Sequence, residues 1–316
     1  MSEGIRRIAM KIEYAGEKFC GSQMQAGVRT VQEDLEKALN AFFRTRHERA
    51  IKATLSGRTD TGVHAYGQVM HFDLSDEFLL RAFGSTTNGG NKTAPDSASL
   101  PAHATYPISI SPAGEPLIDD LVLNRICWAL NGILQKDLSI VQAQVVPSHF
   151  NARHSAILRT YVYRILNRPQ RSALGHNMQH FVQAPLDTEA MKLAAQSLLG
   201  QHDFSAFKSS NADKTSPICR VSRAELLKKG ESELEFWISA NHFVYNMVRI
   251  IVGTLIDIGL NKRAPSDLAK ALAGKDRHLA GPTAASRGLC LHSVDYPAEF
   301  CLFQGDPELV SVSQEK

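Results

Sequence analysis

The sequence predicts a fold of the α+β class, and two kinds of pattern carry that prediction. Apolar residues alternate with other residues over 8–14 and again over 68–74, which is the period of a strand with one buried face. Between these segments, Thr30 and Glu33 form a capping box ahead of an apolar stripe at helical spacing over 35–42. A strand, a helix, a glycine-bounded turn and a strand in this order make a compact α+β unit.

The first half of the chain is predicted to span residues 1–148. Residues 84–116 are rich in Gly, Ser, Thr, Asn, Ala and Pro, carry five prolines and show little apolar periodicity, so we expect a flexible insertion there. An apolar stripe over 123–133 then predicts a helix that helps to complete this half.

The second half is predicted to span residues 149–316 and to begin with a strand. Residues 159–165 alternate in the way of a strand that turns one face inward. The other predicted elements are a helix from about Asp187 to Gly200, strands over 218–227 and 234–240, an apolar helix over 244–252, a short helix after Ser266 and a final strand over 289–294.

Composition fits a globular protein of a reducing compartment. The chain has 316 residues, of which 43% are hydrophobic, and no apolar run approaches the length of a membrane span. Strand-like alternation begins by Ile8, which leaves little room for a signal or transit peptide. The five cysteines are odd in number and form no Cys-x-x-Cys pair, so we expect a cytoplasmic protein, with an organelle as the alternative.

No metal and no cofactor is expected. The twelve histidines include none of the paired arrangements, with a neighbouring acid, that a zinc hydrolase shows. We interpret most of them as core or surface residues.

Asp60 is the first candidate for a functional group. It lies in the run LSGRTDTGVHA at residues 55–65, where two glycines permit a tight turn and a close approach by a ligand. An alternative is an Asx-type turn in which the aspartate only satisfies backbone donors, and the spacing alone allows both.

Arg249 is the second candidate, because it is the only charge between Phe243 and Ile256. The surrounding run is apolar around nearly its whole circumference, which predicts a buried helix. A buried guanidinium without a partner is very costly, so a carboxylate, a phosphate or a cluster of carbonyls must meet it.

A stretch without acidic residues suggests contact with nucleic acid. The net charge of the chain is only +3, but residues 138–186 contain no Asp or Glu. Arginine pairs with phosphate and aromatic side chains stack on unpaired bases, so we expect an RNA-facing wall in this stretch. It carries Tyr161, Tyr163 and the arginines Arg153, Arg159, Arg164, Arg168 and Arg171.

Several segments, in order along the chain, resemble the TruA family of tRNA pseudouridine synthases. The run GRTDTGVHA at 57–65 resembles the catalytic signature of that family and differs mainly at Thr61, where alanine is usual. The other matching segments are FCGSQMQ at 19–25, FNAR at 150–153, RTYVY at 159–163, DFSAF at 203–207 and NHFVYNMVR at 241–249.

The resemblance implies a fold and a set of site residues. The fold has two similar ferredoxin-like halves whose mostly antiparallel sheets join into one central sheet, with helices packed behind and the active-site cleft between the halves. Asp60 would be the catalytic group, Arg249 its partner and Tyr161 the residue that stacks on the target uracil. The residues expected to bind substrate are Gln23, Arg58, His64, Arg153 and Arg159.

The resemblance also implies an activity and a partner. The enzyme would isomerise specific uridines of tRNA, with the anticodon stem-loop as the expected region, and would need neither a cofactor nor a membrane. It allows a homodimer. Two other classes stay open: a non-catalytic tRNA-binding or tRNA-folding protein on the same fold, and a hydrolase that uses Asp60 as an acceptor.

Two departures from the family pattern bear on substrate choice. Ser22 stands where tryptophan is usual, which predicts the loss of a large apolar contact near the cleft. Gln135 replaces a common proline. Neither change removes a group expected to be catalytic.

Overall fold

The computed structural model describes residues 4–45, 50–86, 108–111, 115–209 and 216–303. One large sheet runs through these residues in the order β6-β1-β3-β12-β7-β11-β10-β9, with β2 paired to β3 and β8 paired to β7. Its strands are β1 (Ile5–Tyr14), β2 (Thr54–Leu55), β3 (His64–Ser75), β6 (Leu138–Val146), β7 (Leu158–Asn167), β8 (His180–Val182), β9 (Gly200–Asp203), β10 (Ile218–Lys229), β11 (Glu233–Ala240) and β12 (Leu289–Asp295).

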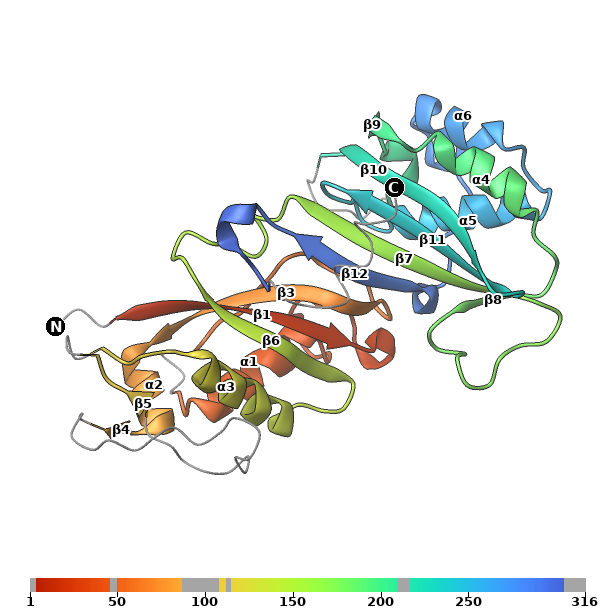
Figure 1. The fold of residues 1–316 in the computed structure, drawn as a ribbon. Coiled ribbons are helices and arrows are strands. Elements are labelled where there is room, and N and C mark those ends of the chain that lie inside the picture. The colour runs from red at the N-terminus through yellow and green to blue at the C-terminus, as the bar shows by residue number, and fades with distance from the viewer. Residues whose placement is uncertain (1–3, 46–49, 87–107, 112–114, 210–215, 304–316) are drawn as a thin grey trace.

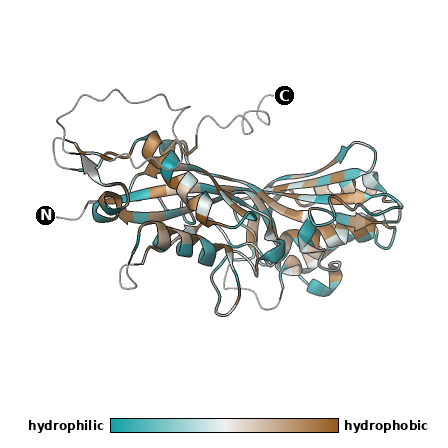
Figure 2. Cartoon of the chain, turned by 90° about the horizontal axis from the view of Figure 1, so that it is seen from below, coloured by the Kyte–Doolittle hydropathy of each residue, from teal (hydrophilic) through white to brown (hydrophobic). Residues whose placement is uncertain are grey.

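Six α helices in the described residues accompany the sheet. In Figure 1 the first three lie beside the strands of the first half and the last three beside those of the second. They are α1 (Val31–Phe42), α2 (Asp76–Phe83), α3 (Asp120–Ile133), α4 (Thr188–Gln196), α5 (Met247–Gly259) and α6 (Ser266–Gly274). Strands and helices alike carry both apolar and polar segments, as Figure 2 shows, which is the pattern of elements with one face in a core.

The two halves meet where β12 lies between β3 and β7. Cys290 and Leu291 of β12 pair in parallel with His64 and Ala65 of β3, and the same strand runs antiparallel to β7. Apart from this pair and the β7–β8 pair, the pairs of the large sheet are antiparallel. The expected single, mostly antiparallel central sheet is therefore confirmed, whereas the domain boundary at residue 148, between β6 and β7, stays a prediction.

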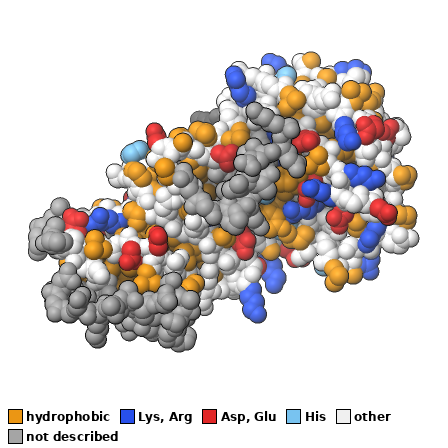
Figure 3. All heavy atoms as spheres, in the orientation of Figure 1, with side chains coloured by type: hydrophobic (Ala, Val, Ile, Leu, Met, Phe, Trp, Pro, Cys, Tyr) orange, Lys and Arg blue, Asp and Glu red, His pale blue; other side chains and the backbone are white. Residues whose placement is uncertain are grey.

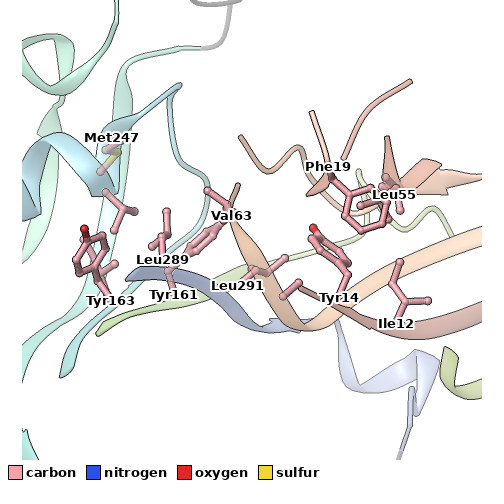
Figure 4. Close-up of a cluster of buried hydrophobic side chains, with 14 of the residues drawn as sticks. Ile12, Tyr14, Phe19, Leu55, Val63, Tyr161, Tyr163, Met247, Leu289 and Leu291 are labelled. Atoms are coloured by element: carbon pink, nitrogen blue, oxygen red, sulfur yellow. The ribbon is translucent and has the colours of Figure 1, made fainter. Parts of the chain in front are cut away.

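A continuous core crosses this junction. Figure 4 shows it running from Ile12 and Tyr14 of β1 through Leu291 of β12 to Tyr161 of β7 and Met247 of α5. Each of these side chains is less than one tenth exposed. Because one core holds both halves, the loops at the junction are placed against each other by packing as well as by the sheet.

Strand β3 differs from its prediction as a strand with one buried face. Met70 and Phe72 face the main core, but Val69 and His71 on the other side are also buried. A second apolar cluster that includes Phe150 and Phe300 packs there, and the Ala152 N–H donates to His71 Nδ1. Alternation in sequence cannot reveal this second layer, because the residues that form it come from far along the chain.

Several predicted elements need correction at their ends. The helix expected to reach Gly200 ends at Gln196, and Gly200 begins β9. The apolar helix expected over 244–252 begins only at Met247, because Asn246 takes a left-handed conformation with φ 63°. Strand β6 and helix α2 were not predicted, although Ser75 ahead of Asp76 and Glu77 is an N-cap signal for α2.

The predicted insertion contains ordered structure at both ends. Strands β4 (Ser85–Thr86) and β5 (Ile108–Ser109) pair in parallel, and Ile108 is 1% exposed within the main core. Residues 87–107 and 112–114 of the predicted insertion lie outside the described residues. The prediction of a flexible segment is thus wrong for Ile108, which packs in the main core.

Candidate active site

A cavity of about 810 Å³ opens between loops from both halves of the chain. Segments 20–25 and 56–61 line it from the first half, and segment 242–249 lines it from the second. Further lining side chains come from Arg153, His154, Ala156, Arg159, Tyr161, Lys208 and Leu289. All three residues predicted to be catalytic border this one cavity.

Asp60 lies in the loop between β2 and β3. Gly62, with φ +77°, permits the turn, and the Val63 N–H closes it by donating to the Asp60 carbonyl at 3.1 Å. The side chain of Asp60 is 19% exposed, and its Oδ2 lies 3.5 Å from Arg249 Nη1. The carboxylate therefore meets a charge from the other half, whereas the turn is closed by the backbone carbonyl of Asp60.

Arg249 is held in place by two further acceptors. Its Nε donates to the Ala284 carbonyl at 2.8 Å, and its Nη1 donates to Asn246 Oδ1 at 2.8 Å. Asn246 can do so because it lies just before α5 in a left-handed conformation, which asparagine tolerates better than most residues. The sequence predicted a carboxylate, a phosphate or a cluster of carbonyls as the partner of this guanidinium, and the structure supplies a carboxylate and a backbone carbonyl.

Burial and charge act in opposite directions on Asp60. Burial raises the pKa of the Asp60 carboxyl above its ordinary value, and the Arg249 guanidinium lowers that pKa only part of the way back. The carboxylate is thus less solvated, and more basic, than one at the protein surface. Such a group is suited to attack or to stabilise an electron-poor carbon.

Tyr161 forms part of the cavity wall from β7. It is 9% exposed and packs edge-to-face against Phe243, with ring centroids 5.1 Å apart. Burial strongly raises the pKa of its phenol, so the hydroxyl stays protonated at neutral pH. Tyr163, expected to be a packing residue, is fully buried and donates its hydroxyl to the Ala285 carbonyl at 2.8 Å.

Three of the residues predicted to bind substrate lie on the rim of the cavity. Gln23 and Arg58 reach it from the first half and Arg153 from the second, and all three are exposed. A polyanionic ligand in the cavity would therefore meet side chains from both halves.

Arg159 also borders the cavity, but its donors already have acceptors. Its Nη1 donates to the carbonyls of Ala156 and Asn241, and its Nη2 donates to the carbonyls of Ser56 and Arg153, at distances from 2.8 to 3.2 Å. Arg159 thus joins loops from the two halves, and its role in substrate binding stays a prediction.

His64 is not a cavity residue. It is 1% exposed, its Nδ1 accepts from the Gly16 N–H at 3.0 Å, and burial lowers its pKa. The prediction that it binds substrate is wrong in this structure, because the residue begins β3 and points into the protein interior.

The stretch without acidic residues does not form one basic wall. Arg164 lies outside the cavity and pairs with Glu235 of the neighbouring strand at 3.1 Å. Arg168, which is half-buried, and Arg171, which is exposed, do not line the cavity. On the face drawn in Figure 3, basic and acidic side chains are interspersed. The acid that pairs with Arg164 comes from β11, far from residues 138–186 in the sequence.

Ser22 has a different role from the one that its sequence position predicts. The residue is fully buried, and its Oγ accepts from the Thr59 N–H at 2.8 Å. Where a lost apolar contact was expected, the structure therefore shows a polar contact to the residue next to Asp60. No sequence signal indicated this contact or the partnership of Asn246 with Arg249.

Two kinds of feature are absent from the part of the chain that the structure describes. It contains no group of three or more His, Cys, Asp or Glu side chains that could hold a metal ion. None of its helices has the length and apolar character needed to cross a membrane.

Known proteins similar to this chain are tRNA pseudouridine synthases. Residues 194–297 match the family described as tRNA pseudouridine synthase. Over longer spans, the chain is 38% identical to tRNA pseudouridine synthase A of Halalkalibacterium halodurans, with 90% of each chain covered. It is 35% identical to the protein of that name from Paraburkholderia phytofirmans, covering 94% of this chain and 93% of the relative. It is 37% identical to the protein of that name from Methylococcus capsulatus, covering 94% of this chain and 92% of the relative. The chain belongs to the TruA family of tRNA pseudouridine synthases.

Similarity to one solved structure is slight. The chain shares 8% identity and a TM-score of 0.27 with a chain from the crystal structure of a Cbf5-Nop10-Gar1 complex, covering 89% of this chain and 56% of that one.

Proposed function

We propose that this protein isomerises specific uridines of tRNA to pseudouridine and that Asp60 is its catalytic group. The observation that carries the proposal is the pairing of Asp60 with Arg249, at 3.5 Å, in a cavity shared by both halves of the chain. The names of the relatives support the reaction and the substrate class.

The chemistry needs a carboxylate and no other reagent. The bond between the sugar and the base nitrogen breaks, the base turns, and a new bond joins the sugar to a base carbon. That carbon loses its proton and the freed nitrogen gains one, so the product is an isomer of the substrate. Asp60 attacks or stabilises the electron-poor sugar carbon, as a carboxylate does in retaining glycosidases. Tyr161 and Phe243 provide an aromatic wall against which a uracil ring can lie.

The target uridine must leave its stack to reach Asp60. Extruding a base costs roughly a few kcal/mol, and the cost is least for a base that is already unpaired. We therefore propose the anticodon stem-loop as the region of action. Arg58 and Arg153 on the rim would contact the phosphates on either side of the extruded nucleotide.

We also propose a cytoplasmic homodimer. Each of the five cysteines is free, which fits a reducing compartment. Strand β6 lies at one edge of the large sheet and exposes Val141 and Val145, which offer an apolar surface for a second copy. Sedimentation of the purified protein tests the assembly directly.

Mapping of pseudouridine in total tRNA tests the activity. Transfer RNA from cells lacking the protein is compared with the same RNA after incubation with purified protein and no added cofactor. We expect pseudouridine to appear at a small number of loop positions, also in the presence of a metal chelator. Binding of tRNA without any new pseudouridine would favour the non-catalytic alternative.

A further inference from the structure

A group of buried polar side chains lies directly behind Asp60 and contacts Thr59. The Ser22 Oγ accepts from the Thr59 N–H at 2.8 Å, and the Ser22 N–H donates to the Thr59 carbonyl at 3.1 Å. On its other side, Thr59 Oγ1 is hydrogen-bonded to the Tyr14 hydroxyl at 2.7 Å. The backbone and the side chain of the residue before Asp60 are therefore both fixed.

These contacts form in the interior of the protein. Ser22 is 0% exposed, Tyr14 5% and Thr59 6%. A buried polar group that loses its partner destabilises the protein, so each group in the set favours the arrangement in which it is hydrogen-bonded. A solvated loop would lack this constraint, because water could replace each partner.

Ser22 is itself tied to a rigid element. Its carbonyl accepts from the N–H of Gln32, in the first turn of α1, at 2.9 Å. The preceding Gly21 has φ +86°, and a Cβ at that position would lie 3.0 Å from the Thr59 carbonyl. The loop at 20–25 and the loop at 56–61 are therefore in close contact. Because Ser22 is hydrogen-bonded to both α1 and Thr59, it fixes the position of Thr59, and so of Asp60, relative to α1.

We propose that Ser22 is a positioning residue that sets the direction of the Asp60 carboxylate toward the substrate sugar. The proposal rests on the proposed function, in which Asp60 is the catalytic group. Arg249, the partner of that carboxylate, is held in place by Asn246 and the Ala284 carbonyl of the second half of the chain. Ser22 in the same way holds the loop that carries Asp60, through its hydrogen bonds to Thr59.

The test compares Ser22→Ala with a matched loss of another buried hydroxyl. Ser239 is 4% exposed, its Oγ is hydrogen-bonded to Thr160 Oγ1 at 2.8 Å, and it does not line the cavity. For Ser22→Ala we expect kcat on a tRNA substrate to fall about 10- to 100-fold with KM within about twofold, because misplacement of a reacting group acts on the chemical step. Ser239→Ala should lower the melting temperature and leave kcat unchanged.

Hydrogen exchange and a partial rescue separate positioning from general destabilisation. In Ser22→Ala, amide exchange should accelerate within residues 56–62 more than elsewhere. In Ser22→Cys, the sulfur is a weak acceptor and should restore part of kcat. A Ser22→Ala protein with wild-type kcat would overturn the positioning role alone, as would equal loss of kcat in both alanine variants. A wild-type protein that forms no pseudouridine would overturn the proposed function and this role together.

Discussion

At the scale of single residues, the site depends on one ion pair in which burial and charge oppose each other. Burial raises the pKa of Asp60 and Arg249 lowers it, with burial the larger cause. Arg249 in turn is oriented by Asn246 and the Ala284 carbonyl, so it cannot swing away to solvent without losing both hydrogen bonds. The reactivity of Asp60 is therefore set by a cation held at a fixed place.

Replacing Arg249 should shift the acidic limb of the pH–rate profile. In the proposed mechanism the ionised form of Asp60 is the active one, so activity should fall as the pH drops through the Asp60 pKa. Because Arg249 lowers that pKa, Arg249→Gln should raise it and move the acidic limb of kcat to higher pH. Arg249→Lys, which keeps the charge, should move it less. An unmoved limb in Arg249→Gln would contradict the electrostatic role of the pair.

Arg153 and Arg159 allow binding to be separated from structure. Arg153 is exposed on the rim, so Arg153→Ala should weaken tRNA binding and flatten its salt dependence by somewhat under one unit of slope, at an unchanged melting temperature. The Nη atoms of Arg159 donate to four carbonyls, so Arg159→Ala should lower stability by about 1–3 kcal/mol. Binding titrations and thermal melts check both. If Arg153→Ala instead lowered stability and Arg159→Ala only weakened tRNA binding, Arg153 would be the structural residue and Arg159 the binding residue.

At the scale of elements, the sequence predicts best where the signal is local. Thr30 accepts from the Glu33 N–H at 3.3 Å, as the capping box at the start of α1 predicts. The start of α5 was misplaced because the backbone of Asn246 turns left-handed to serve Arg249, and an apolar pattern does not record such a turn. The second buried face of β3 was missed because Phe150 and Phe300, which cover it, are distant in sequence.

The ends of the predicted insertion provide a test at this scale. Ile108 is 1% exposed and packs in the main core, so Ile108→Ala should lower the free energy of unfolding by about 2–5 kcal/mol through lost burial and a new cavity. Ile110→Ala, at a partly buried position two residues on, should cost less. Denaturant melts measure both. Wild-type stability of Ile108→Ala would restore the interpretation of this position as part of a flexible segment.

At the scale of the whole molecule, the site exists only because two distant parts of the chain meet. Asp60 comes from a loop ahead of β3 and Arg249 from α5, and the β3–β12–β7 junction holds the two halves together. The sequence predicted this pairing through a family resemblance, and chemistry alone required only that Arg249 have some partner. Arg58, Arg153 and Arg159 border the cavity, as predicted. The ion pair of Arg164 with Glu235 could not be predicted, because the two residues are distant in sequence.

The most direct test of the central claim is turnover by Asp60→Asn. The amide is nearly isosteric with the carboxylate but cannot act as a nucleophile or a base. Asp73→Asn is the matched control, since Asp73 pairs with Arg7 at 2.7 Å and does not line the cavity. We predict that purified Asp60→Asn binds tRNA within several-fold of wild type and forms no pseudouridine, whereas Asp73→Asn remains active. Substantial pseudouridine formation by Asp60→Asn would contradict the assignment of Asp60 as the catalytic group.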